Sequence, residues 1–241
     1  MNILITSGGT KIPIDSVRSI TNMSKGTFGA KLAKEFLNKK QFVTFLTHKS
    51  ARTPFKIEID LEQPIDYNEL INKQLWAKTV SSYYEEIQYD TFWEYASLLE
   101  ESIKEDNPDV VLLACAASDY EVSNPVNGKV RTSAQMNIEL QPLPKLISKI
   151  RNEWNYGGVL VGFKLLVGSA QEELIESARK FVVENGCDFV IANDLNDIKA
   201  GNHKIIIVSK DTEYNVGKFK AIENIINEIE IAHNTRIRTN R

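Results

Sequence analysis

Residues 3–29 read ILITSGGTKIPIDSVRSITNMSKGTFG, in which an apolar strand ends in two glycines and leads through a polar turn to the start of a helix. Glycines at the end of a strand let the backbone approach an oxygen-rich ligand. The N-terminus of the next helix directs unpaired N–H groups and a positive dipole end toward that ligand. We therefore expect phosphate to bind at Gly8 and Gly9, and Ser24 to cap the helix. Alone, such a turn is a weak signal, since many strand ends need glycine.

Strands alternate with helical patterns along most of the chain. This alternation is typical of a mostly parallel sheet covered by helices on both faces, so the sequence predicts a three-layer, Rossmann-like α/β fold. We expect a single nucleotide-binding domain over residues 1–241, with core helix in the aromatic-rich segment 68–106. Strands are predicted at residues 2–7, 41–47, 56–60, 109–115, 159–163, 188–192 and 204–208, and helices around Leu32, Leu99, Ile150, Ala178 and Ile225.

The segment DVVLLAC at residues 109–115 is the clearest buried strand, and it delivers residues 116–120 to its carboxyl end. Ligands bind at that edge in open α/β sheets. The following residues, about 121–140, have no helical period and contain Asn-Pro and Asn-Gly pairs, which are typical of turns. We expect them to form a flap or hairpin that closes on a ligand.

Composition and charge exclude several classes of protein. A formal net charge of -3 over 241 residues gives no support for a nucleic-acid partner. The opening MNILIT lacks the basic start and long apolar run of a signal peptide or membrane span, so we expect a cytoplasmic protein without membrane contact. Cys115 and Cys187 each adjoin an apolar run and are expected to be buried, reduced thiols. The histidines lack metal-ligand spacing.

Three polar residues lie near the expected ligand edge. Arg18 can hold a carboxylate or a phosphate through two parallel hydrogen bonds, and Asn22 can orient a carbonyl group. The alternative for Arg18 is a surface ion pair with Asp15. Lys129 can neutralise charge that develops on a transferring phosphorus, or it can be a solvated loop charge. Taken singly, these residues do not decide a function.

A dinucleotide-binding enzyme would need G-x-G-x-x-G and an acidic residue at the end of the second strand. This chain has Gly8-Gly9 and then Thr47-His48-Lys49 at those positions. A short-chain NAD(P) oxidoreductase is therefore a weaker alternative.

Together, the motifs resemble those of phosphopantothenate-cysteine ligase, an enzyme of coenzyme A biosynthesis. They are ITSGGT, PIDSVRSITN and AASDY, a flap lysine in GKV, and then LPKLI, VGFKLL and IANDL, in the family's order. About residues 50–108 and the last thirty residues carry no motif that can be matched. Because no flavin-dependent decarboxylase region precedes the first motif, the chain resembles the stand-alone bacterial form and not the fused bifunctional enzyme.

The resemblance implies a ligation in two steps. The carboxylate of 4'-phosphopantothenate attacks the α-phosphorus of a nucleoside triphosphate, which releases pyrophosphate and leaves an acyl-nucleotidylate. The cysteine amine then displaces the nucleotide and forms the amide. This chemistry needs charge neutralisation, alignment and exclusion of water, but no side-chain nucleophile.

The resemblance also implies roles for individual residues. Asn22 would hold the activated acyl group, and Lys129 would act on the triphosphate in the first step, so these two are the expected catalytic residues. Those implied to bind 4'-phosphopantothenate are Arg18, Asn22, Cys115, Ala116 and Asp119. Those implied to bind the nucleotide are Gly8, Gly9, Thr10, Ser24, Gly26, Lys129, Lys145 and Phe163. Whether Arg18 acts within its own subunit or across a dimer stays open.

Magnesium, the choice of nucleotide and the assembly complete the expectations. Mg²⁺ would bridge the triphosphate, held mainly by phosphate oxygens and water, and the sequence does not reveal a protein ligand for it. CTP is favoured over ATP, although Phe163-Lys164-Leu165 and Pro144-Lys145 resemble the ATP-using branch as much as the CTP-using one.

A homodimer is expected from the resemblance and from the many aromatic residues between Trp76 and Tyr95. The basic segment 236–241 is expected to be a solvated end. The alternative from another class is a nucleotide-binding module that keeps this fold without catalysis.

Overall fold

A computed structural model describes residues 1–57, 66–132, 136–200, 204–216 and 221–239 of the protein. Within these residues the central sheet has eight strands, and two small sheets have two each. The central strands are β1 (Asn2–Ser7), β4 (Phe42–His48), β5 (Tyr84–Tyr89), β6 (Val110–Leu113), β9 (Val159–Leu166), β10 (Phe189–Asp194), β11 (Ile205–Ser209) and β12 (Glu213–Val216). The small sheets pair β2 (Lys11–Pro13) with β3 (Ser19–Thr21), and β7 (Tyr120–Val122) with β8 (Leu140–Pro142).

The central sheet is mostly parallel, as the sequence predicts. Its strand order is β12-β11-β10-β9-β6-β1-β4-β5, and every pair from β10 to β5 is parallel. The pairs β10–β11 and β11–β12 are antiparallel and end the sheet on one side. The strands of this sheet come from residues 2 to 216. One nucleotide-binding domain over residues 1–241 stays a prediction.

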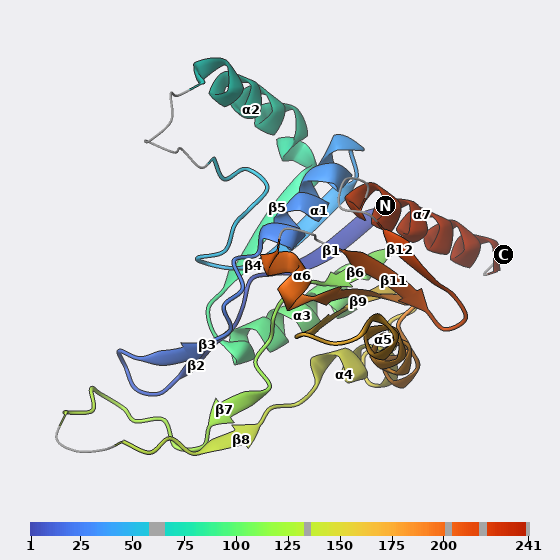
Figure 1. Ribbon diagram of the computed structural model, residues 1–241. Coiled ribbons are helices and arrows are strands. Elements are labelled where there is room, and N and C mark those ends of the chain that lie inside the picture. Colours follow the sequence, from blue (N-terminus) through green and yellow to red (C-terminus); the bar gives the residue numbers. More distant parts are fainter. Residues whose placement is uncertain (58–65, 133–135, 201–203, 217–220, 240–241) are drawn as a thin grey trace.

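Helices cover both faces of the sheet and complete the three layers (Figure 1). They are α1 (Thr27–Asn38), α2 (Tyr67–Val80), α3 (Phe92–Asp106), α4 (Leu146–Asn152), α5 (Gln171–Asn185), α6 (Leu195–Lys199) and α7 (Ala221–Thr239), with a 3₁₀ turn, η1, at Ser81–Tyr83. Side chains of α1 and α7 pack on one face of the sheet, and those of α3, α4 and α5 pack on the other. Alternate residues of β1, such as Leu4 and Ile5, belong to the two different cores.

The strand order places a topological switch point between β1 and β6. From β1 the chain moves outward to β4 and β5 and then returns through α3 to β6, which lies on the other side of β1. Loops at the carboxyl ends of two such strands diverge and leave a crevice, in which open α/β sheets bind ligands. Gly8 and Gly9 follow β1, and Cys115 and Ala116 follow β6. The topology therefore brings two of the sequence motifs to one place.

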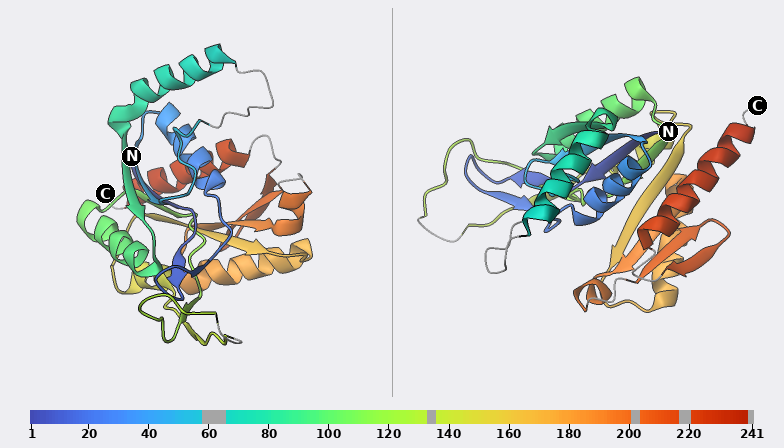
Figure 2. Two further views of the ribbon diagram at one scale, coloured as in Figure 1. Left: turned by 90° about the vertical axis from the view of Figure 1, so that its left-hand side faces the viewer. Right: turned by 90° about the horizontal axis from the view of Figure 1, so that it is seen from above.

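Two hairpins project beyond the carboxyl edge of the sheet, and we call them together the arm (residues 11–21, 120–132 and 136–142; Figures 1 and 2). They lie side by side, because the Val126 N–H donates to the Ile14 carbonyl at 3.0 Å and the Ser16 N–H donates to the Gly128 carbonyl at 3.1 Å. The antiparallel β7–β8 pair confirms the predicted hairpin excursion around residues 121–140. Residues 133–135 lie outside the described part.

The predicted Ser24 cap is wrong. Helix α1 begins at Thr27, and its N-cap residue is Gly26, with φ +71° and no side-chain capping bond. The Ser7 hydroxyl donates to the Gly26 carbonyl at 3.1 Å, and a Cβ on Gly26 would lie 2.8 Å from the Ser7 Oγ. Close contact with the end of β1 therefore places a glycine at the cap position.

Segment 68–106 differs from the expected core helix. It contains α2, strand β5 and α3, of which α3 matches the predicted spacing. Only Ile87 and Tyr89 of YEEIQY keep a period of two, because Glu85 and Glu86 are adjacent and exposed, so the sequence gives a weak signal for β5. Residues 56 and 57 are not in a strand, and the remainder of the predicted strand 56–60 lies outside the described residues.

The expectation of a solvated basic end is wrong for Arg236. Helix α7 continues to Thr239, and the Arg236 guanidinium binds the Asp188 carboxylate at 2.6 Å and the Gly157 carbonyl at 2.8 Å. The end of this helix is thus attached to the amino edge of the sheet.

Candidate active site

The glycine turn after β1 is close-packed against protein on both sides. Gly8 has φ +92°, and a Cβ there would lie 2.8 Å from the His48 Cβ and 3.0 Å from the Ala51 Cβ. A Cβ on Gly9 would lie 2.9 Å from the Asn22 carbonyl oxygen. Glycine is therefore required at both positions by the neighbouring chain. Binding of a phosphate by this turn stays a prediction.

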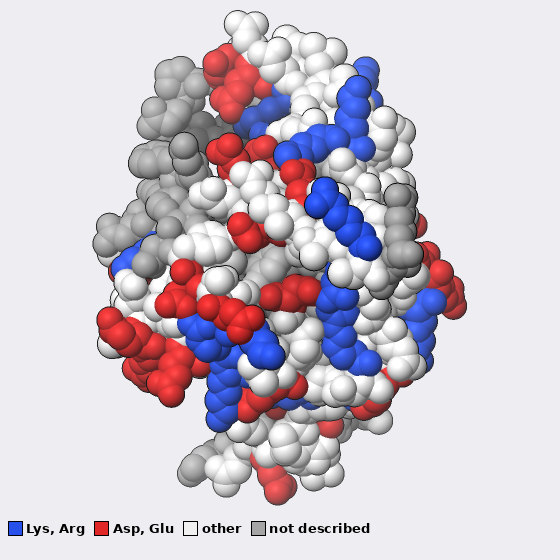
Figure 3. Space-filling view, turned by 90° about the vertical axis from the view of Figure 1, so that its right-hand side faces the viewer, with Lys and Arg blue, Asp and Glu red and all other residues white. Residues whose placement is uncertain are grey.

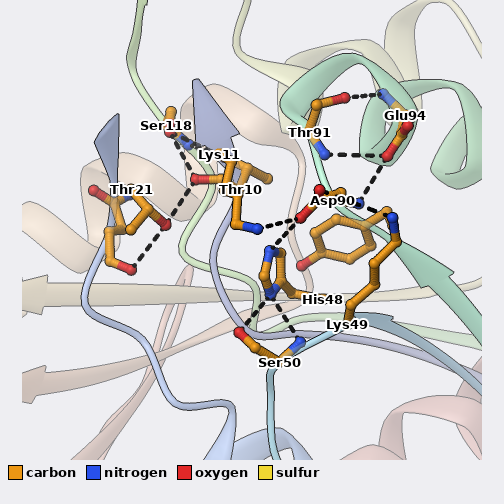
Figure 4. Close-up of polar contacts among 12 residues, drawn as sticks. Thr10, Lys11, Thr21, His48, Lys49, Ser50, Asp90, Thr91, Glu94 and Ser118 are labelled. Carbon is orange, nitrogen blue, oxygen red and sulfur yellow. Dashed lines mark hydrogen bonds and ion pairs between the residues drawn. The ribbon is translucent and has the colours of Figure 1, made fainter. Parts of the chain in front are cut away.

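The loop after β6 is bonded directly to this turn. The Ala116 N–H donates to the Gly8 carbonyl at 2.8 Å, and Gly9 and Ala116 form a parallel bridge. Thr10 is fully buried, and its hydroxyl oxygen lies 2.9 Å from the Ser118 backbone nitrogen and 3.0 Å from the Ser118 Oγ (Figure 4). The Thr10 hydroxyl thus fastens one loop to the other. Because the side chain is buried and bonded to Ser118, this position does not support the predicted contact of Thr10 with a nucleotide. That contact stays a prediction.

Asn22 lies across the same two loops. Its side-chain Nδ2 donates to the Ala116 carbonyl at 2.9 Å and to the Ala117 carbonyl at 3.1 Å. Both N–H bonds are thereby used by protein, and the Oδ1 atom of this exposed residue is directed away from them. The structure therefore brings Asn22 and Ala116, two predicted site residues, into contact.

Arg18 makes the ion pair with Asp15 that the sequence left as the alternative. Its Nη2 lies 2.5 Å from the Asp15 Oδ2, and it also donates to the Val130 carbonyl at 2.8 Å. The Val130 N–H donates to the same Asp15 oxygen at 3.1 Å. The Arg18 guanidinium, followed by backbone N–H donors, lowers the pKa of the fully buried Asp15 carboxyl well below its usual range. Asp15 thus joins the two hairpins of the arm, while the Arg18 side chain stays 42% exposed.

The predicted lysines lie farther out. Lys129 is exposed in the arm next to Val130, and it makes no hydrogen bond or ion pair with another residue of the described chain. Lys145 forms an ion pair with Asp119, and both side chains are largely exposed. The structure therefore brings a predicted nucleotide residue and a predicted pantothenate residue together.

Cys115 follows β6, and Phe163 lies within the neighbouring strand β9. The Cys115 Sγ is 3.0 Å from the Tyr89 hydroxyl, and burial raises the pKa of this thiol to about 12, so it is a neutral packing group and not a nucleophile. Both cysteines are free, as predicted. Phe163 packs edge-on against Phe28 of α1, with ring centroids 5.6 Å apart, so it lies on the α1 side of the sheet.

No group of three or more His, Cys, Asp or Glu side chains within the described residues is arranged to hold a metal ion. The nearest carboxylates are already paired, Asp15 with Arg18 and Asp119 with Lys145. This donor set does not form a protein cage for magnesium. Magnesium therefore stays a prediction.

A polar cluster around the buried His48, behind the glycine turn, was missed from the sequence. The His48 Nε2 lies 3.1 Å from the Asp90 Oδ1, and the same Asp90 atom binds the Lys11 ammonium at 2.7 Å (Figure 4). The Ser50 N–H donates to the His48 Nδ1 at 3.1 Å. His48 ends β4 and Asp90 follows β5, so the rule that ligand loops lie at carboxyl ends would have located both residues.

The face drawn in Figure 3 carries both signs of charge side by side. This agrees with the lack of a charge argument for nucleic acid. No helix in the described ranges is both long and apolar enough to cross a membrane.

A mostly parallel sheet with two loops joined at its switch point defines a Rossmann-like α/β protein with a ligand crevice at that edge. Over residues 1–66 and 86–231 the chain matches the family described as DNA/pantothenate metabolism flavoprotein C-terminal domain. The protein belongs to this family, which confirms the resemblance seen in the sequence.

Named relatives and solved structures agree with this family. The chain is 32% identical to the Coenzyme A biosynthesis bifunctional protein CoaBC of Thermococcus kodakarensis over 209 residues, which cover 87% of this chain and 45% of that protein. It is 30% identical to the phosphopantothenate--cysteine ligase CAB2 of Saccharomyces cerevisiae, with 68% of this chain and 57% of that protein covered. The chain thus spans about half the length of these curated relatives.

Two solved structures share the whole fold. The DNA/pantothenate metabolism flavoprotein from Streptococcus pneumoniae has a TM-score of 0.77 and 28% identity, and covers 96% of this chain and 99% of its own. A Cab2 mutant in complex with phosphopantothenate-cysteine has a TM-score of 0.82 and 27% identity, and covers 99% of this chain and 88% of its own.

Proposed function

We propose that the protein is a phosphopantothenate-cysteine ligase that acts in coenzyme A biosynthesis. The observation that carries this proposal is the contact of Asn22 with Ala116 at the switch point of a fold whose relatives are named for that activity. The structural similarity to a Cab2 mutant in complex with phosphopantothenate-cysteine further supports it. The substrates would be 4'-phosphopantothenate, cysteine and a nucleoside triphosphate.

In the first step, the carboxylate of 4'-phosphopantothenate would attack the α-phosphorus while pyrophosphate leaves. The glycine turn and the first N–H groups of α1 would face the phosphates, because α1 has no side-chain cap and no acidic residue in its first turn. Lys129, exposed in the arm, would neutralise the triphosphate as the bond to pyrophosphate breaks. Magnesium would reduce repulsion between the phosphates, held by their oxygens and by water.

In the second step, the cysteine amine would attack the acyl carbon of the nucleotidylate, and the nucleoside monophosphate would leave. Asn22 would orient the acyl group, since the bonds of its Nδ2 to Ala116 and Ala117 fix the plane of its amide. The Cys115–Asp119 loop would shape the pantothenate pocket. No charged side chain needs to form a covalent intermediate in this scheme.

Arg18 would bind 4'-phosphopantothenate through the part of its guanidinium that Asp15 and Val130 leave exposed. The ion pair with Asp15 would then hold Arg18 in position instead of replacing its role. Arg18 would act either within its own subunit or across a dimer. Activity measured after two mutant proteins are mixed would distinguish these two outcomes.

A homodimer is part of this proposal. Most of the aromatic residues that suggested it pack within the chain itself: Tyr89, Phe92 and Tyr95 are buried, and Trp76 packs against Phe55 at 5.3 Å between ring centroids, whereas Trp93 is exposed. Exposed apolar side chains of the arm now support assembly better, namely Val17, Ile20, Val126, Ile138 and Leu140. A monomeric mass at micromolar concentration would contradict the dimer.

CTP is the nucleotide we propose, with ATP as the alternative. Pyrophosphate release is measured with 4'-phosphopantothenate, cysteine, magnesium and either nucleotide. Release that requires 4'-phosphopantothenate is expected, and faster release with CTP. A nucleotide-binding module without catalysis would bind nucleotide and release none, and a short-chain oxidoreductase would instead reduce NAD(P).

A further inference from the structure

His48 is the one histidine at the carboxyl edge of the sheet within the described residues, and the proposed reaction gives it no role. It is only 6% exposed. Its ring lies edge-on to Tyr89, with centroids 5.9 Å apart, and its two nitrogens point in opposite directions to different partners. A buried imidazole with both nitrogens bonded is a rigid connector between the groups that it contacts.

The bonds of His48 define its tautomer. The Ser50 backbone N–H can only donate, so the Nδ1 atom must accept at 3.1 Å, and the proton resides on Nε2. The Nε2–H then donates to the Asp90 Oδ1 at 3.1 Å. A neutral imidazole is therefore the form that satisfies both partners.

The Ser50 bond closes a tight turn, residues 48–51, directly beneath the glycine turn. The Ala51 N–H donates to the His48 carbonyl at 2.8 Å. The Ala51 methyl group lies 3.0 Å from the position of a Cβ on Gly8 and 2.9 Å from that of a Cβ on Gly26. The His48 Cβ contacts the same side of Gly8 at 2.8 Å. Both left-handed glycines thus rest on this one turn.

We propose that His48 is a positioning residue for the nucleotide: by accepting the Ser50 N–H, it holds the 48–51 turn against Gly8 and Gly26 and so fixes the N–H groups that meet the phosphates. This inference rests on the proposed function for the identity of the ligand. It assigns His48 no contact with substrate. We expect the cradle to contribute uniform binding of the nucleotide, so its loss should raise the KM more than it lowers kcat.

Two substitutions separate the two bonds of the imidazole. In His48→Asn, the Oδ1 atom takes a position close to that of Nδ1 and can accept the Ser50 N–H, while the Asp90 contact is lost. In His48→Gln, the longer side chain reaches Asp90 and leaves the Ser50 N–H without its acceptor. We expect His48→Gln to raise the KM for the nucleotide roughly tenfold, with kcat changed less than twofold, and His48→Asn to restore the KM to within about twofold of the wild type.

The dependence of the nucleotide KM on pH provides a second test of the proposal. Protonation of Nδ1 would turn a donor toward the Ser50 N–H, and the proton could then be accepted only by the Ser50 Oγ, 2.9 Å from Nδ1, so the bond to the backbone would be lost. The groups facing His48 are the Asp90 carboxylate, the Lys11 and Lys49 ammonium groups that bind Asp90, and the Tyr89 ring, and burial lowers the pKa of His48 below its ordinary value of 6.5. Wild-type KM for the nucleotide should therefore rise once the pH falls below the lowered pKa of His48, while the KM of His48→Asn should not show this rise.

The experiment combines steady-state kinetics with calorimetric titration of CTP and ATP, so that nucleotide binding is measured without turnover. His233→Asn is the matched control, because His233 also faces an aspartate, Asp109 at 3.5 Å, but lies on α7 away from the glycine turn. Equal nucleotide affinity in wild type, His48→Gln and His48→Asn would overturn the proposal, and so would equal losses in both variants. If His48→Gln does not fold, the pH dependence decides: the nucleotide KM of the wild type should rise at acid pH, and that of His48→Asn should not. Wild-type protein that binds nucleotide but releases no pyrophosphate would contradict the ligase proposal and leave the affinity comparison valid.

Discussion

The two edges of the central sheet are built differently. At the amino edge, Asp188 accepts the Leu160 N–H at 2.8 Å and binds Arg151 at 3.0 Å and Arg236 at 2.6 Å. These bonds tie α4, α7, β9 and β10 together. At the carboxyl edge, Asn22 and Lys129 are exposed. At the amino edge, paired charges stabilise the fold. At the carboxyl edge, the two polar side chains proposed to be catalytic stay exposed to solvent.

Asn22→Asp should give the largest effect, and this effect should be on the reaction at the carboxyl edge. A carboxylate cannot donate to the Ala116 and Ala117 carbonyls, and it repels an acyl phosphate, so amide formation should fall by about a hundredfold or more while the acyl-nucleotidylate accumulates. Mass spectrometry of quenched reactions checks this. Asn185→Asp, at the end of α5, is the control. Normal amide formation by Asn22→Asp would remove Asn22 from the second step.

Lys129→Gln should reduce the first step by about a hundredfold, because the charge developing on the triphosphate loses its counter-charge. Since Lys129 has no partner within the described chain, the melting temperature should not change. Nucleotidylate formation in the absence of cysteine is the measurement. The control is Lys180→Gln, an exposed lysine of α5. Unchanged formation would reassign Lys129 to a solvated loop charge.

Asp188→Ala should act in the opposite way, on stability and not on chemistry. It removes the carboxylate that binds two arginines and one backbone N–H at a site that is 20% exposed, which costs about 2–3 kcal/mol of the free energy of unfolding, although both arginines keep backbone carbonyl acceptors. Urea denaturation measures the loss. Asp188→Asn, which can still accept the Leu160 N–H, should lose less. If nucleotide KM changes in parallel with stability, the two edges are not independent.

Substitution of Asp15 should give the smallest effect. It tests whether the ion pair within the arm contributes to the stability of the fold. Its pKa is lowered by Arg18 and by backbone N–H donors, so its contribution to stability is present above the unfolded pKa near 3.8 and is lost as the pH falls below that value. Between pH 4 and pH 2, the melting temperature of Asp15→Asn should therefore fall less than that of the wild type. Parallel acid curves for the two proteins would contradict this contribution.

Much of the fold follows from the chain's local patterns, and the failures have identifiable causes. The strand predicted at residues 109–115, observed as β6, was predictable because its continuous apolar run is buried on both faces of the sheet. Helix α3 was predictable because its regularly spaced apolar residues face one core. Strand β5 was hidden, since its exposed Glu85 and Glu86 interrupt the apolar pattern at the edge of the sheet. The cap of α1 could not be read from Ser24, because the packing of Gly26 on Ser7 is a tertiary contact.

The site was predictable as a set of loops but not as a set of bonds. The glycine pair and the 116–119 segment follow adjacent parallel strands, and sequence order alone places them at one edge. The Arg18–Asp15 pair was one of two open alternatives, and sequence could not choose between them. The bonds of Asn22 to the 116–117 carbonyls and of His48 to Asp90 join residues at least 40 positions apart. The bond of His48 to Ser50 depends on the direction of a side chain within a turn.

Transfer of oxygen from the substrate carboxylate tests the proposed ligation most directly. 4'-Phosphopantothenate labelled with ¹⁸O in its carboxylate is converted with cysteine and CTP or ATP, and the released nucleotide is analysed by mass spectrometry. Attack on the α-phosphorus predicts one ¹⁸O atom in the nucleoside monophosphate and none in pyrophosphate. Label in inorganic phosphate, or an unlabelled monophosphate, would contradict the acyl-nucleotidylate.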